Sequence, residues 1–426
     1  MSVRRVAVTG LGLMTPCGQG WRAYWDAVAG GHSRIGTMSN FSMPDTPFRH
    51  AGEIKNFDPS EFIKQRKSLK VMSREIQLAV AASILAVQDS AIRLEETDRT
   101  RFGISLGTGI INNDLDEMGA GIKTAIGEDG KFSMDKFGAE GIRALFPLWF
   151  LKYLPNMPAC HISIAHGLQG PSNTITTSST AGVQAIGEAF KVIQRSDADL
   201  MIAGSTDSKL NAMGISRFEL LGLLSTREGN PETAYRPFDK GHDGLVLGEG
   251  AGLVILEEWE HARKRGARIY GEVLGYGSAS EFNHDHNAKE DIKGKRYAMI
   301  RALGDAQVNS GEIDLLMANG SGVPQEDITE ARAVGSVFEN SLKHLRVTGV
   351  KPITGHLVYG SGGVEFSAAA LALHEGLVPP LANFESPDPE CDLPFVRKAE
   401  HTSVRRLLLN SFGFGGQNAS LVLRKA

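Results

Sequence analysis

Short apolar runs rich in β-branched residues alternate with helical periods along this chain. The runs predict strands at residues 3–10, 101–106, 200–204, 252–256, 269–277, 315–318 and 407–411. Strands that are apolar throughout are typical of a sheet with helices on both faces. The pattern therefore predicts an α/β layered fold.

Helical periods occupy the segments between these runs. Residues 73–90 repeat apolar side chains at Ile76, Val80, Ile84 and Val87, which gives a helix one buried face. Other helices are predicted at residues 182–195, 258–265, 326–338 and 363–375. The last lies in the stretch SGGVEFSAAALALHEG, and a helix so small and apolar is expected to be buried on all sides.

The alternation of strands and helices runs through the chain twice. Its break lies near residues 256–269, so we expect an N-terminal half at residues 1–256 and a C-terminal half at residues 257–426. Residues 112–158, with clustered Gly, Met, Phe and Trp, interrupt the first half and are expected to form an insertion or cap. A chain of 426 residues with 42% hydrophobic content can fill a core of this size.

Charge and cysteine content argue against several classes of protein. The chain has 45 basic and 49 acidic residues, a net charge of −4, which argues against a nucleic-acid or anionic-membrane surface over the whole molecule. No apolar run approaches the roughly 18 residues of a membrane span, and the first residues lack the apolar core of a signal peptide, so a cytoplasmic protein is expected. Cys17, Cys160 and Cys391 have no C-x-x-C spacing and are expected to be free thiols.

Two further motifs are too incomplete to predict a cofactor or a metal. GLGLMT begins like the dinucleotide motif G-x-G-x-x-G but ends in Thr15, and no acidic residue follows at the expected distance. His284 and His286 lack a third ligand. We therefore expect no bound metal and no nicotinamide cofactor.

The first segment with candidate chemistry is TITTSSTAGVQAIGEAF. It leads from β-branched residues through a Ser/Thr turn into a helix, so Ser179 is expected near a helix N-terminus. The helix dipole and the free backbone N–H groups at such a position stabilise an anion or an oxyanion. An ordinary helix cap fits the same residues.

Three later segments place polar or aromatic residues in loops. Asn319 follows an apolar strand, with Asp327 near the start of the next helix; Lys351 and His356 precede the small-residue helix; glycines flank Phe414. A single Asn or His in a loop is more often a structural hydrogen-bonding residue than a catalyst. Only their combination favours a functional site.

Four long stretches carry a resemblance that extends over nearly the whole chain. They are VAVTGLGLMTPCG, RPFDKGHDGLVLGEGAGLVILEEWEHARKRGARIYGEVLGYG, KPITGH with the downstream Glu365, and NSFGFGGQNASL. The chain resembles the elongating (type II) β-ketoacyl-acyl-carrier-protein synthases. The resemblance implies a duplicated thiolase fold in five layers, α/β/α/β/α, usually paired as a dimer. It implies no cofactor beyond the phosphopantetheine arm that an acyl carrier protein delivers.

The resemblance also implies a role for each candidate residue. The cysteine that the family acylates matches Ser179, and the family's two histidines match Asn319 and His356. Lys351 and Glu365 match its supporting lysine and glutamate.

Two further residues complete the implied site. Asp327 matches the family's loop acid, and Phe414 matches its gating phenylalanine. The resemblance implies an oxyanion hole made by the backbone N–H groups of Ser179 and Phe414.

The two replaced residues change the expected chemistry. A cysteine at a helix N-terminus ionises near neutral pH, whereas Ser179 needs a general base within about 3 Å or a bridging water, and His356 is the candidate. Asn319 still has an amide that donates a hydrogen bond to a thioester oxygen. Malonyl decarboxylation is therefore expected to survive, while acyl transfer to residue 179 is the step that the replacement impairs.

Three functions fit such a site. The resemblance favours a chain-length factor of aromatic or aryl-polyene polyketide synthesis, which lacks the cysteine and pairs with a cysteine-bearing ketosynthase. The alternatives are a serine-dependent acyltransferase or hydrolase of the same fold, and an atypical condensing enzyme. A homodimer is the alternative assembly.

A basic stretch precedes the first long helix. Lys64, Arg66, Lys67 and Lys70 lie in the region where ketosynthases bind their acidic carrier protein, and charge complementarity would speed that encounter. A solvated surface is the alternative interpretation.

Overall fold

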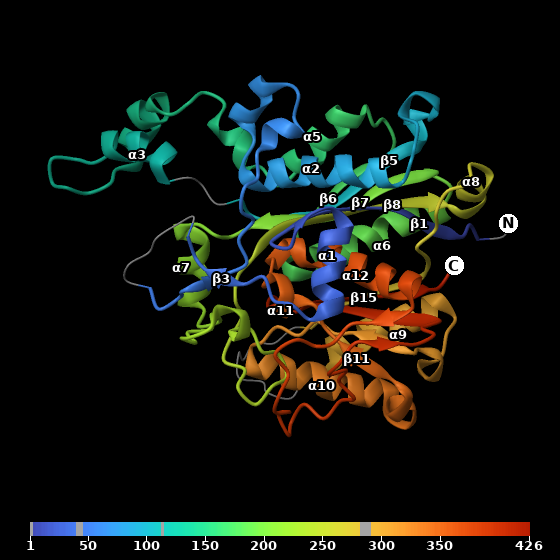
Figure 1. Ribbon diagram of the computed structural model, residues 1–426. Coiled ribbons are helices and arrows are strands. Elements are labelled where there is room, and N and C mark those ends of the chain that lie inside the picture. Colours follow the sequence, from blue (N-terminus) through green and yellow to red (C-terminus); the bar gives the residue numbers. More distant parts are fainter. Residues whose placement is uncertain (1–2, 40–45, 112–114, 282–290) are drawn as a thin grey trace.

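Five layers of helices and strands make up the protein (Figure 1). Two halves of one sheet form the second and fourth layers, and helices form the two outer layers and the central one. The computed structural model describes residues 3–39, 46–111, 115–281 and 291–426. The layer order α/β/α/β/α agrees with the prediction.

The two halves of the sheet repeat one strand order. One half runs β1, β8, β7, β5, β6 and the other runs β9, β15, β14, β10, β11. In chain order, each half therefore places its first strand beside its fifth, followed by its fourth, second and third. The halves join where β1 pairs with β9, at Val6 opposite Val273. This repeat is the structural counterpart of the twofold rhythm in the sequence, while the boundary between residues 256 and 257 stays a prediction.

Four of the five strands of the first half overlap the predicted ones, and β6 was not predicted. The five strands are β1 (Val6–Thr15), β5 (Phe102–Gly107), β6 (Ser172–Ile175), β7 (Leu200–Ser208) and β8 (Glu249–Glu258). Those of the second half are β9 (Gly271–Ser280), β10 (Leu315–Met317), β11 (Arg346–Thr348), β14 (Arg406–Phe412) and β15 (Gln417–Arg424).

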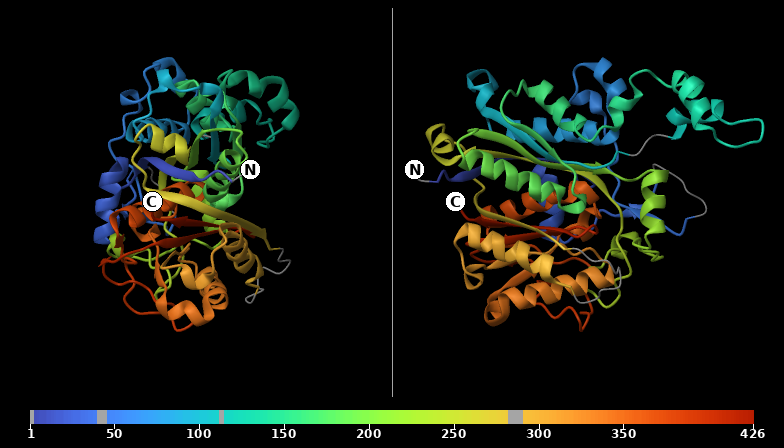
Figure 2. Two further views of the ribbon diagram at one scale, coloured as in Figure 1. Left: turned by 90° about the vertical axis from the view of Figure 1, so that its right-hand side faces the viewer. Right: turned by 180° about the vertical axis from the view of Figure 1, so that it is seen from behind.

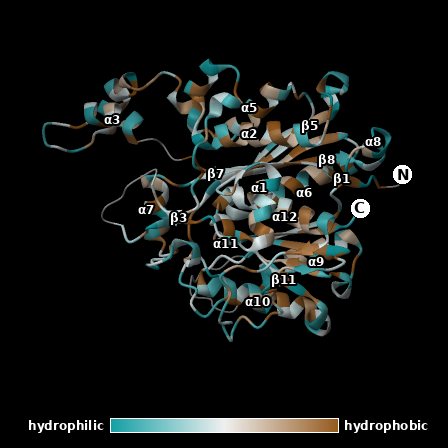
Figure 3. Cartoon of the chain, viewed as in Figure 1, coloured by the Kyte–Doolittle hydropathy of each residue, from teal (hydrophilic) through white to brown (hydrophobic). Residues whose placement is uncertain are grey.

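Helices form the other three layers. The outer layer beside β1 and β8 contains α2 (Arg74–Asp89) and α5 (Met157–His166), and the outer layer beside β9 and β15 contains α9 (Lys293–Ala306) and α10 (Pro324–Phe338). The central layer contains α6 (Ala181–Gln194) and α12 (Ser361–Glu375). Every residue of α12 from Ser361 to Leu373 is buried, which confirms the helix predicted to be covered on all sides. Figure 3 shows β8 and the helix α2 that packs on it as largely hydrophobic.

The first strand is longer than predicted because its glycines belong to it. A Cβ on Gly12 would lie 1.9 Å from the carbonyl oxygen of Ala82 in α2. Helix α2 packs on the strand backbone itself, so only glycine fits there. The glycine-rich sequence that marks a turn by composition is here a site of close helix–strand contact.

The predicted cap is a protruding group of short helices (Figure 2). It includes α3 (Leu115–Thr124) and α4 (Met134–Lys136), followed by a π-helical turn over Phe137–Gly141. The large apolar side chains of Leu115, Met134 and Phe150 are each more than half exposed on it.

The structure also bears on the predictions about cysteines, membrane spans and metal ligands. All three cysteines are free thiols, as predicted. None of the described helices is long and apolar enough to cross a membrane. Within the described ranges no three His, Cys, Asp or Glu side chains are grouped to hold a metal, and His284 and His286 lie outside those ranges.

Candidate active site

Ser179 lies in the turn that connects β6 to α6. The turn places Ser178 at a φ of 56°, a left-handed conformation that costs a non-glycine residue free energy. Ser179 itself is fully buried, and its backbone oxygen accepts a hydrogen bond of 3.1 Å from the Ser411 hydroxyl. Its own Oγ is buried without a hydrogen-bond partner among the described residues. The structure thus puts this hydroxyl at the start of α6, as predicted, but leaves it unactivated.

His356 lies in the loop between α11 (Lys351–Thr354) and α12. Its Nδ1 accepts a hydrogen bond of 2.9 Å from the backbone N–H of Val358. Burial, with a smaller effect of the Lys351 charge, holds the pKa of His356 well below its usual value. The ring is therefore neutral, and because Nδ1 is an acceptor, the proton is on Nε2. That Nε2 is buried and has no partner among the residues described.

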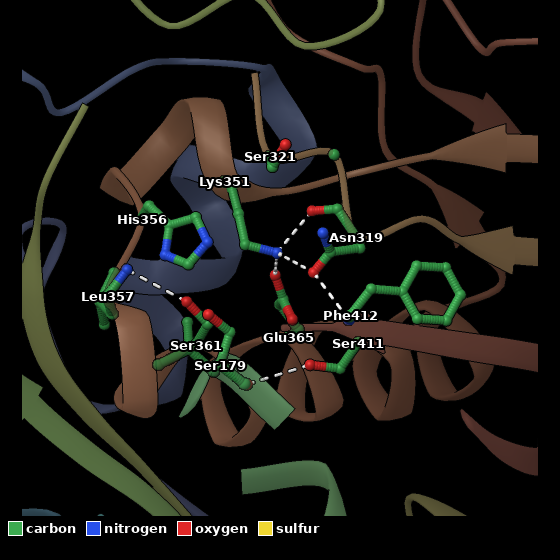
Figure 4. A network of polar contacts seen from close by, with 12 residues as sticks. Ser179, Asn319, Ser321, Lys351, His356, Leu357, Ser361, Glu365, Ser411 and Phe412 are labelled. Carbon is green, nitrogen blue, oxygen red and sulfur yellow. Dashed lines mark hydrogen bonds and ion pairs between the residues drawn. The ribbon is translucent and has the colours of Figure 1, made fainter. Parts of the chain in front are cut away.

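Lys351, Glu365 and Asn319 form one buried network (Figure 4). Lys351 Nζ pairs with Glu365 Oε1 and donates to the backbone oxygen and the Oδ1 of Asn319, at 2.5 and 3.1 Å. The backbone N–H of Phe412 donates to the same Oδ1 at 3.2 Å. Two donors on one oxygen fix the orientation of the amide, so the Nδ2 of Asn319 is the end that can donate to a ligand.

The loop that carries Asn319 is held by two carboxylates of α10. Glu330 accepts the backbone N–H groups of Asn319 and Gly320 at 2.8 and 2.9 Å, and burial raises its pKa to about 7. Asp327 accepts the N–H groups of Phe238 and Gly322 at 2.9 and 3.1 Å. Sequence reasoning singled out Asp327 but missed Glu330, although the spacing of three residues on one helix face was a signal for it.

Phe414 lies beside the site. Its ring centroid is 5.8 Å from that of His356, and the residue is half-buried in the turn between β14 and β15. The two strands form an antiparallel hairpin with Phe412 opposite Asn418. The roles of Phe414 as gate and as oxyanion-hole donor stay predictions.

The predicted docking residues lie elsewhere on the surface. Lys64, Arg66, Lys67 and Lys70 are all exposed, in and next to a 3₁₀ helix over Arg66–Val71 that precedes α2. The structure therefore brings the other candidate residues together and keeps these four apart from them, as a separate basic surface.

The burial of His356 predicts how the stability of the protein depends on pH. Its pKa is depressed in the folded state, whereas the unfolded chain binds a proton near pH 6.5. The contribution of His356 to the free energy of unfolding is therefore complete above about pH 6.5. Below that pH it falls by up to about 1.4 kcal/mol per pH unit.

Urea unfolding at two pH values measures this contribution. Between pH 7.5 and 5.5, we expect the wild type to lose about 1 kcal/mol more stability than His356→Gln loses, because glutamine does not titrate. Equal losses would show that His356 is not a buried neutral imidazole.

Comparisons with known proteins agree with this geometry. Residues 3–262 match the beta-ketoacyl synthase N-terminal domain and residues 270–385 match the C-terminal domain. The chain is 36% identical, over 427 aligned residues, to 3-oxoacyl-[acyl-carrier-protein] synthase 2 of Vibrio harveyi, covering 100% of this chain and 99% of the relative.

Two solved structures are also similar to this chain. One contains a type II acyl-carrier protein in complex with its ketosynthase bound to the hexaketide, with 28% identity, a TM-score of 0.85 and full coverage of both chains. The other is the ishigamide ketosynthase/chain length factor, with 28% identity, a TM-score of 0.87 and the same coverage. The duplicated layers described above are thus those of the ketosynthase thiolase fold.

Proposed function

Because the chain belongs to the beta-ketoacyl synthase family, we propose that it is the non-condensing subunit of a ketosynthase pair, of the chain-length-factor type, that acts on carrier-bound acyl chains. One observation carries the proposal. Ser179 Oγ and His356 Nε2 are both buried and neither makes a hydrogen bond within the described part of the chain. The hydroxyl therefore has no base in direct hydrogen-bond contact among the described residues.

The tautomer of His356 also disfavours proton transfer from Ser179 to the ring. To take a proton from Ser179, Nε2 of His356 would have to be unprotonated. The single proton of the neutral ring would then be on Nδ1. Protonated Nδ1 would face the N–H of Val358, which now donates to it, and two donors cannot share one hydrogen bond. The site thus supports hydrogen-bond donation by His356 and disfavours acyl transfer to serine.

A second activity is supported by the two donors that remain. Nε2–H of His356 and Nδ2 of Asn319 are suited to bind the thioester oxygen of a malonyl group. When the bond to the carboxylate breaks, carbon dioxide leaves and the electron pair forms an enolate, whose oxygen these donors stabilise. Water then protonates the carbon. We propose this decarboxylation as the residual chemistry of the pocket.

Two exposed surfaces support assembly with another subunit. Strand β6 is the last strand of its half of the sheet, and such an edge presents unpaired backbone groups. The protruding cap exposes Leu115, Met134 and Phe150, and exposed apolar surface of this kind marks interaction sites. We propose that a cysteine-bearing ketosynthase covers both.

Co-expression tests this assembly. We expect the tagged chain to co-purify with a cysteine-bearing ketosynthase of its own genome, and carbon–carbon bond formation to require both subunits. A homodimer that ignores every such ketosynthase, or condensation by the chain alone, would overturn the proposal.

The basic surface offers a test of carrier-protein binding. Lys67→Glu with Lys70→Glu reverses two exposed charges, so we expect at least a tenfold weaker association with acyl carrier protein at low salt and a smaller effect at high salt. Titration calorimetry measures the dissociation constant of the complex with acyl carrier protein. Arg263→Glu with Lys264→Glu, both exposed on α8 (Trp259–Lys264), changes the net charge by the same amount and is the control, and equal effects of both variants would exclude a specific docking surface.

A further inference from the structure

A second buried ion pair lies close to the site but outside the proposed chemistry. Lys209 Nζ is 2.5 Å from Asp207 Oδ1, with side-chain exposures of 5% and 2%. Asp207 is near the end of β7, and Lys209 directly follows that strand. Lys209 also donates a hydrogen bond of 2.8 Å to the backbone oxygen of Ile110. Ile110 belongs to the segment that leads from β5 toward the cap, so the pair is attached to the base of the cap.

The same pair is attached to the loop of His356 on its other side. Asp207 Oδ2 accepts the backbone N–H of Tyr359 at 3.2 Å, and Lys209 Nζ lies 5.2 Å from the centroid of the Tyr359 ring. Burial raises the pKa of Tyr359, and the backbone N–H of Ile110 is among the groups that oppose that rise. Both backbone groups of Ile110 therefore interact with residues that contact each other.

One of the two residues between His356 and Tyr359 is in a conformation that needs such support. Val358 has a φ of 49°, which is rare for a β-branched residue and costs on the order of 1–3 kcal/mol. Its backbone N–H is the group that donates to Nδ1 of His356. The Tyr359 N–H, one residue further on, is fixed by Asp207. The unfavourable backbone conformation therefore sets the tautomer of the imidazole.

We propose that Asp207 and Lys209 are positioning residues that connect the base of the cap to the turn that fixes the tautomer of His356. A partner subunit that binds the cap then influences the hydrogen-bond donor in the pocket without contacting it. This functional consequence rests on the proposed function, but the connection itself does not. A buried ion pair that merely fills space is the competing explanation, because removal of one buried partner always destabilises the fold.

The test uses the full chain and a double variant that removes both charges of the pair. Asp207→Asn with Lys209→Met keeps an acceptor for Tyr359 and the volume of the lysine stem, but removes the bond to Ile110. The matched control is Lys191→Met with Asp305→Asn. In that pair Lys191 binds Asp305 Oδ1 at 2.6 Å and the backbone N–H of Tyr276 binds Oδ2 at 2.9 Å. The bonding pattern is the same, but the pair is more exposed, at 30% and 29%, and it lies far from His356 in sequence.

Nitrogen-15 NMR of histidine-labelled protein reads out the tautomer directly. The His356 resonances are assigned by their loss in His356→Gln. In the wild type and the control we expect two widely separated ring-nitrogen resonances, as a single tautomer gives. In the double variant we expect their separation to fall by at least half, because both tautomers become populated.

Unchanged His356 resonances in a folded double variant would overturn the proposal, whatever the activity of the complex. If that variant fails to fold by circular dichroism, Tyr359→Phe decides instead. It removes only the hydroxyl contact with Ile110, and a smaller change in the same direction is expected. No change in Tyr359→Phe would then count against the connection.

Discussion

Replacing Ser179 by cysteine is expected to make the chain take up an acyl group from an acyl-carrier-protein thioester. A cysteine thiol has a pKa near 8.5 and a lower one at a helix N-terminus, and residue 179 lies in the 3₁₀ turn that leads into α6, two residues before its first residue. The thiolate attacks the thioester carbon, and the pantetheine thiolate leaves and takes a proton. No general base is needed, so the absence of a hydrogen bond between residue 179 and His356 no longer matters.

Intact-mass measurement after incubation with the thioester detects this gain. We expect most Ser179→Cys molecules to carry the acyl mass. Ser178→Cys, one residue earlier in the same turn, is the matched control and is expected to stay unmodified. If Ser179→Cys also remains unmodified while folded, residue 179 does not occupy a nucleophile's position.

Lys351→Met is expected to destabilise the protein by about 3–5 kcal/mol. The side chains of Lys351 and Glu365 are only 3% and 2% exposed, and burial raises the pKa of Glu365 while Lys351 opposes that rise. Without the lysine, Glu365 is either charged and unpaired or must bind a proton. Asn319 also loses the two hydrogen bonds that Lys351 donates to it.

Urea unfolding followed by circular dichroism measures the loss. Lys351→Met with Glu365→Gln removes the unpaired charge, so we expect it to recover more than half of the lost stability. A loss of less than about 1 kcal/mol in the single variant would show that the pair contributes little to stability, as exposed ion pairs do. A double variant no better than the single one would assign the loss to the hydrogen bonds with Asn319.

The layers of the fold could be predicted from hydrophobic spacing, but helix α9 could not. Helix α12 was predicted because its burial on all sides leaves a continuous apolar sequence. Helix α9 was not, because it packs against glycines of β9: a Cβ on Gly277 would lie 2.3 Å from the backbone oxygen of Ala298. Such close packing requires small side chains on both elements, which removes the large apolar residues that mark a helix face.

The members of the site could be predicted from the resemblance, but their protonation could not. Sequence left open whether His356 serves Ser179 as a base. The answer depends on a backbone N–H two residues further along, at Val358, and on the left-handed turn that directs it to Nδ1. No residue type in that loop indicates such a turn, because a β-branched residue rarely adopts it.

Intact-mass measurement of the wild-type chain shows whether Ser179 accepts an acyl chain. The purified chain is incubated with an acyl-carrier-protein thioester, and a cysteine-bearing ketosynthase serves as the positive control. We predict an unchanged mass for this chain and an acyl increment for the control. A stable acyl increment on this chain that Ser179→Ala abolishes would contradict the account.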